Sequence, residues 1–111
     1  MMAAMSTAPT ETEDSALPPL PLVGASPWEI RAALHPEYRD AFDRDYQAAL
    51  VEASRSLDLA GMHDTVEHWR RRSWITRDRQ EHRRVIRRAV ELLTGHEPPA
   101  DEPVLVTEAR L

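Results

Sequence analysis

The chain contains no cysteine, no lysine and no long apolar run. Without cysteine it can form neither disulfides nor thiolate metal sites, which fits a reducing cytoplasm. No apolar run approaches the ~20 residues that a membrane-spanning helix needs. Residues 1–21 hold no basic residue and no apolar signal core, so secretion is not expected. These absences predict a cytoplasmic protein without a membrane partner.

Glycine is also scarce, and no catalytic motif can be recognised. The three glycines, Gly24, Gly61 and Gly95, lie too far apart to build a phosphate-binding loop. His63 and His68 are five residues apart, which separates them by about 140° on a helix, whereas paired zinc ligands usually lie four residues apart. We therefore predict a protein that is not an enzyme and that holds no cofactor or metal.

Aromatic residues are few, but all six lie between residues 28 and 74. This concentration predicts a core inside a helical domain at residues 26–95. Ser, Thr, Pro and acidic residues dominate residues 1–25, which we predict to be a disordered Pro-rich tail. The Pro-x-x-Pro spacing at residues 17–22 is typical of a stiff polyproline II spacer or of a ligand for an aromatic groove. Residues 96–111 are predicted to be a second disordered tail, acidic and Pro-rich, with a short apolar segment.

Capping signals mark the first two helices of this domain. Ser26, Pro27 and Glu29 have the spacing of a capping box with proline at the first helical position. The short helix that they begin should stop at Leu34, because a proline follows two residues later. An apolar stripe with helical period then predicts a longer helix over residues 36–57.

Two further helices complete the predicted fold. Apolar and small residues spaced 3-4-3-4 form the seam of a third helix that runs from about residue 59 to Ser73. Trp74 and Ile75 lie off this seam, so we place them in a turn that closes over the core. Asp78 begins a fourth helix, which Gly95 ends. The prediction is an all-α fold: a small bundle of three main helices plus a short N-terminal helix.

A folded unit of about 70 residues is near the size at which a single core is only marginally stabilising. A homodimer or a tightly bound protein partner would supplement such a core.

Positive charge is concentrated in one segment of this acidic chain. Residues 70–88 hold nine of the fourteen arginines and carry a net charge of +7, although the whole chain carries −5. Residues 1–68 and 89–111 carry −8 and −4. One group of arginines occupies the arc of the fourth helix opposite its apolar residues: Arg83, Arg84, Arg87 and Arg88. A second group lies at the end of the third helix, where cations complement the helix dipole: Arg70, Arg71 and Arg72.

Three interpretations of this basic face stay open. It can be a solvated surface that pairs with the acidic second helix, although each exposed pair contributes only ~0–1 kcal/mol. It can bind operator DNA, if the third and fourth helices form a helix-turn-helix whose basic helix enters the major groove. It can also bind a protein partner through the arginines and Trp74, residue types that are enriched at binding hot spots.

Four segments resemble a family of short, uncharacterised helical proteins from high-GC actinobacteria: Phe42-Asp43-Arg44-Asp45-Tyr46, Leu57-Asp58-Leu59, His68-Trp69-Arg70-Arg71 and His82-Arg83-Arg84. The resemblance covers residues 37–95. Members of that family look like the upstream neighbours of small toxins of the RelE/ParE fold. The resemblance therefore implies an antitoxin that binds and neutralises a small basic toxin protein. Many antitoxins also bind their own promoter, so a DNA-binding regulator is the alternative.

The C-terminal tail offers one more candidate contact. Its apolar segment, Val104, Leu105 and Val106, could add a strand to the exposed sheet edge of a partner. The other interpretation, which the short length of the segment favours, is a frayed tail with a few apolar residues.

Overall fold

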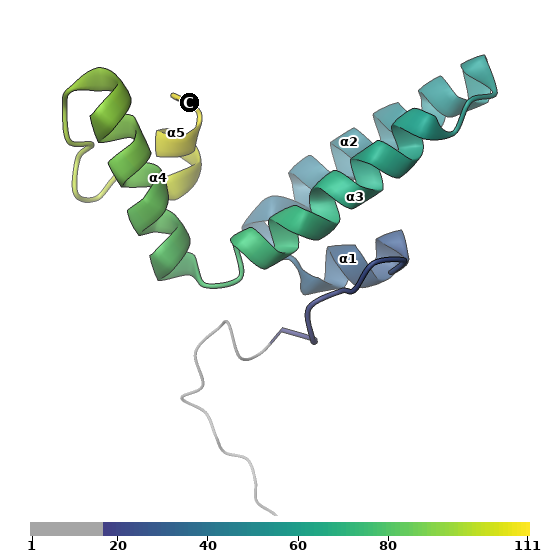
Figure 1. Ribbon diagram of the computed structural model, residues 1–111, viewed down its shortest axis with the longest axis horizontal. Coiled ribbons are helices and arrows are strands. Elements are labelled where there is room, and N and C mark those ends of the chain that lie inside the picture. The colour runs from purple at the N-terminus through teal and green to yellow at the C-terminus, as the bar shows by residue number, and fades with distance from the viewer. Residues whose placement is uncertain (1–16) are drawn as a thin grey trace, which may run out of the picture. The chain divides into compact units, whose positions relative to one another are not determined.

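The computed structural model describes residues 17–111, so most of the predicted N-terminal tail lies outside the described part. Within residues 17–111 the chain is all-α, with helices α1 Pro27–Ala33, α2 Pro36–Ser56, α3 Ala60–Ile75, α4 Arg79–Thr94 and α5 Val104–Glu108 (Figure 1). The predicted fold class, with a short leading helix and three main helices, is confirmed. The helices belong to two compact units, which divide after Arg77.

Helix α1, the first helix of the first unit, begins with the capping box that the sequence predicts. The Ser26 hydroxyl accepts a hydrogen bond from the Glu29 N–H at 3.1 Å, and the Glu29 carboxylate accepts one from the Ser26 N–H at 2.8 Å. Helix α1 ends at Ala33, and His35 is extended because Pro36 disfavours helical geometry before it. The fully buried His35 ring lies 2.8 Å from the Arg77 carbonyl, so it ties the α1–α2 corner to the end of α3.

The core of the first unit lies at one end of the α2–α3 hairpin. Its buried members come from all three helices: Ile30, Leu34, Tyr38, Phe42 and Trp69. The Phe42 ring meets the Trp69 ring edge-on, with centroids 5.9 Å apart. Such aromatic contacts stabilise a core beyond the area that they bury. We call this end of the hairpin, residues 36–44 and 66–75, the proximal half.

The other end of the hairpin, residues 45–65, is the distal half. Helix α1 packs against α3 beside the proximal half, and the distal half extends beyond it (Figure 1). Between residues 45 and 65, Ala53 is the sole buried residue. Two helices share only one seam, so their outer apolar residues stay exposed where no third element covers them.

The Pro-rich segment differs from the prediction of a disordered tail where the structure describes it. Pro21 is buried, and its carbonyl accepts hydrogen bonds from the Trp74 indole N–H at 2.8 Å and from Arg70 at 3.4 Å. The Pro18 carbonyl accepts one from Arg77. Proline-rich backbone has carbonyl oxygens without intrachain donors, so side-chain N–H groups can bind it. Residues 18–21 are therefore packed against α3.

The predicted turn at Trp74 and Ile75 is wrong. Helix α3 continues through Ile75, and the turn follows at residues 76–78. Trp74 is 46% exposed, so it does not close over the core. The helix continues because no proline or glycine occurs between Met62 and Ile75, and the hydroxyls of Ser73 and Thr76 are satisfied by carbonyls one turn back, at 2.6 and 2.8 Å.

The second unit consists of α4, α5 and the segment that joins them. Asp78 caps α4 as predicted, and Gly95 ends it with φ of 80°, a left-handed conformation that suits glycine. Residues 96–103 lead to α5, whose Thr107 is fully buried and donates to the Glu102 carboxylate at 2.7 Å. The predicted boundary at residue 95 and the disordered tail at 96–111 are therefore wrong, because α5 extends the helical structure to Glu108.

Candidate functional site

The predicted contact residues of α3 take part in interactions within the first unit. The Arg70 side chain is 15% exposed and forms two hydrogen bonds to the Glu67 carboxylate, at 2.7 and 2.9 Å. The Arg72 guanidinium lies 5.4 Å from the centre of the Tyr38 ring and 5.5 Å from that of Trp69. Cation–π contacts of this kind attach an arginine to the core. Both arginines therefore stabilise the fold.

Two predicted contact residues of α4 bind the C-terminal segment of their own unit. Arg83 donates to the carbonyls of Ala100 and Glu102 at 2.5 and 2.9 Å. Arg87 donates to the carbonyls of Pro98 and Pro99, both at 2.6 Å. Hydrogen bonds from a charged donor are about twice as strong as neutral ones. Arg83 and Arg87 therefore hold residues 98–102 along α4.

The other predicted arginines keep exposed head groups. Arg84 and Arg88 are 70% and 65% exposed, and each pairs with a carboxylate on its own helix, Glu81 and Glu91 respectively. Arg71 lies 3.4 Å from Glu67 and is also exposed. The single basic face of the helical wheel is thus divided into arginines that bind the chain itself and arginines that face solvent.

The C-terminal apolar segment does not have the conformation expected for strand addition. Val104, Leu105 and Val106 form the first turns of α5, where Leu105 and Val106 are exposed. Pro103 precedes the helix with extended geometry, and the Thr107 hydroxyl also lies 3.2 Å from its carbonyl. The prediction of an extended segment is wrong, because these local hydrogen bonds begin a helix.

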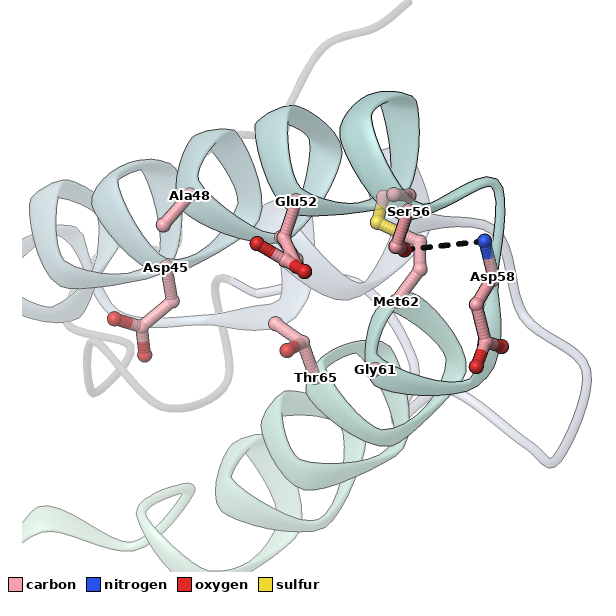
Figure 2. Close-up of a pocket in the computed structure, with 10 residues that line it drawn as sticks. Asp45, Ala48, Glu52, Ser56, Asp58, Gly61, Met62 and Thr65 are labelled. Carbon is pink, nitrogen blue, oxygen red and sulfur yellow. Dashed lines mark hydrogen bonds between the residues drawn. The ribbon is translucent and has the colours of Figure 1, made fainter.

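A groove that sequence reasoning missed lies between α2 and α3 in the distal half (Figure 2). This groove has a volume of about 560 Å³. Small side chains form much of its surface: Ala48, Ala49, Ala53 and Gly61. Side chains of this size leave space between two helices that larger ones would fill. The run of alanines in α2 was the signal in the sequence, but alanine is also a common helix former.

Three carboxylates surround this groove. Asp45 accepts a hydrogen bond from the Trp69 indole N–H at 2.9 Å, and Glu52 pairs with Arg55 at 2.7 Å. Asp58 accepts one from the first N–H of α3 at 2.9 Å, and its own N–H donates to Ser56 at the end of α2 (Figure 2). Residues 45–65 carry four acidic residues and one arginine, a net charge of −3. The groove is therefore acidic.

Ion pairs shift the pKa values of two carboxylates in the first unit. Arg31 of α1 donates two hydrogen bonds to Asp43 of α2, at 2.7 and 2.8 Å, and these lower the pKa of Asp43. The hydrogen bonds from Arg70 lower the pKa of Glu67 in the same way. Both carboxylates therefore stay ionised in moderate acid. The first ion pair connects α1 to α2, and the second lies within α3.

Among residues 17–111, no three His, Cys, Asp or Glu side chains come together in a way that could hold a metal ion. His63 and His68 are exposed, and the His68 ring meets the edge of Trp69 at 5.7 Å. None of the helices in this range has the length and apolar character needed to cross a membrane.

Comparison with known proteins identifies a family for this chain. Searches of curated proteins and of solved structures found no significant similarity. Residues 18–111 match the model of a family of unknown function, DUF6247. This match includes the Pro-rich segment that packs on α3, both helical units and the C-terminal helix. The chain therefore belongs to the DUF6247 family.

Proposed function

We propose that the protein is a non-enzymatic interaction module of the cytoplasm that binds and neutralises a small, basic toxin of the RelE/ParE type. One observation carries the proposal. Arg70, Arg83 and Arg87 are bound to oxygens of the chain itself, whereas the groove between α2 and α3 is lined by the carboxylates of Asp45, Glu52 and Asp58. The surface thus favours a basic partner over a polyanion.

The net charge of residues 36–68 also favours a basic partner. Residues 36–68 carry eight acidic residues and three arginines, a net charge of −5. Complementary charge speeds the encounter of two proteins and opposes binding of partners with the same sign. The resemblance to the upstream neighbours of RelE/ParE-type toxins gives the basic partner its proposed identity.

Co-expression with the adjacent reading frame tests the proposal. We expect the neighbouring product to arrest growth when it is produced alone, and the arrest to disappear when this chain is produced with it. A Trp69→Ala variant, which removes a core side chain, serves as a control that should lose the protection. The proposal fails if the neighbour is harmless alone or remains lethal beside the intact chain.

A DNA-binding regulator is the second candidate, and one observation favours it. A groove of about 360 Å³ on the second unit is lined by four of the five arginines of α4, together with Glu91 and Glu97, and Arg84 and Arg88 keep exposed head groups there. If these two arginines bind phosphates, affinity for the promoter fragment should fall by about 0.9 log units per log unit of salt for each contact.

Substitutions in the second unit can separate DNA binding from toxin neutralisation. Replacing Arg84 and Arg88 with Gln leaves the hydrogen bonds of Arg83 and Arg87 to the C-terminal segment in place. The double variant should lose promoter binding in a gel-shift assay and still neutralise the toxin. If the intact chain does not shift its promoter fragment even at low salt, the DNA-binding candidate is excluded.

A further inference from the structure

The distal half of the hairpin exposes leucines that contribute little to its own packing. Leu57 and Leu59, in the loop between α2 and α3, are 88% and 59% exposed, and Val51 is exposed as well. Single exposed apolar residues are ordinary, but Leu57 and Leu59 directly follow the groove residues Ser56 and Asp58 in the chain, and exposed apolar residues at a groove are typical of a binding surface. The leucines therefore need an explanation other than the stability of the hairpin.

The backbone conformation of Leu57 is unfavourable for a residue with a side chain. It ends α2 in the left-handed conformation, with φ of 60° and ψ of 26°, and it is the one non-glycine residue among residues 17–111 with positive φ. Glycine adopts this conformation without strain, and helices often end on glycine for that reason. A leucine here is strained and exposed at once, so the fold gains nothing from its side chain.

The groove beside these leucines suits a basic partner. Its floor of small residues leaves room for side chains that enter from outside, and Asp45, Glu52 and Asp58 place carboxylates around it. The ion pair between Glu52 and Arg55 lies on the surface, with both side chains more than half exposed. Such a pair exchanges its partner readily, because water already screens it.

We propose that the distal half is the docking surface for an arginine- or lysine-bearing segment of the partner protein. Leu57 and Leu59 contact apolar side chains of that segment, and the three carboxylates bind its basic groups. This inference rests on the proposed function, because it assigns a surface to the same partner. A second copy of the distal half is a poor occupant, since a symmetric contact would bring two surfaces of −3 together.

The experiment measures binding of the purified product of the adjacent reading frame by isothermal titration calorimetry. Leu57→Gly is the informative variant, because it removes the side chain and relieves the backbone strain. We expect its melting temperature to equal or exceed that of the intact chain, while its affinity falls by about tenfold or more, as for a binding hot spot. Glu52→Lys should weaken binding too, and high salt should weaken binding of the intact chain.

Leu92→Ala is the matched control, because Leu92 of α4 is also exposed, at 68%, and lies outside the hairpin. Its affinity should not change. If the intact chain does not bind the neighbouring product, the proposed function fails and this inference fails with it. If the intact chain binds but Leu57→Gly and Glu52→Lys bind equally well, the docking surface is wrong and the function stands. Sedimentation that shows a dimer of the intact chain and a monomer of Leu57→Gly would assign the surface to a second copy instead.

Discussion

Both halves of the α2–α3 hairpin consist of two packed helical segments, but they differ in how many apolar side chains they bury. The proximal half has α1 beside it and buries Tyr38, Phe42 and Trp69 in a shared core. The distal half has small residues along its seam and leucines exposed at its loop. The difference shows that buried apolar contacts are concentrated at one end of the hairpin, so the distal half should open locally at a lower free energy than the proximal half.

The largest expected effect compares truncations in the two halves. Trp69→Ala should lower the free energy of unfolding by about 3–5 kcal/mol, because it leaves a cavity and removes the hydrogen bond to Asp45. Leu59→Ala should change it by no more than about 0.5 kcal/mol, because that side chain is exposed. Urea denaturation followed by circular dichroism measures both. Equal losses would show that the distal half is as well packed as the proximal half.

A smaller effect is expected at the two glycines that occupy different backbone conformations. A Cβ at Gly61, in the first turn of α3, would meet no atom within 4 Å. Gly61→Ala should therefore raise the free energy of unfolding by about 0.5 kcal/mol, because alanine favours a helix. Gly95→Ala should lower it by about 1 kcal/mol, because its φ is 80°. A loss of stability at Gly61 would contradict the open groove of the distal half.

The smallest expected effect is a loss of stability at acidic pH. Asp43 has a pKa below its ordinary value of 3.8 because Arg31 binds it. Its contribution to stability is fully present above the unfolded pKa and is lost as pH falls through the lower folded pKa. The hydrogen-exchange protection factors of amides in α1 should therefore fall below about pH 4. Arg31→Gln should remove most of this pH dependence while leaving exchange in the distal half unchanged, and an unchanged profile would show that the pair does not hold α1.

Local sequence determined where most helices begin and end. Ser26 and Glu29 form the capping box, Pro36 separates α1 from α2, and Asp78 and Gly95 bound α4, all at the predicted positions. These signals could be predicted because each acts within one turn of helix and needs no distant partner. Trp74 and Ile75 were placed wrongly because an off-seam position says which side a residue faces, not whether the helix has ended.

The tertiary structure decided how the arginines and the groove are used. A helical wheel places Arg83 and Arg87 beside Arg84 and Arg88, but only the fold brings the carbonyls of residues 98–102 to the first pair. Likewise, the alanines of α2 form a groove only because α3 packs beside them and side chains this small leave the space between the two helices open. The sequence by itself determined α1, α2 and α4, whose capping and breaking signals act between neighbours along the chain, whereas α5 was not predicted. The available surface was decided by contacts between distant residues, which no periodic pattern encodes.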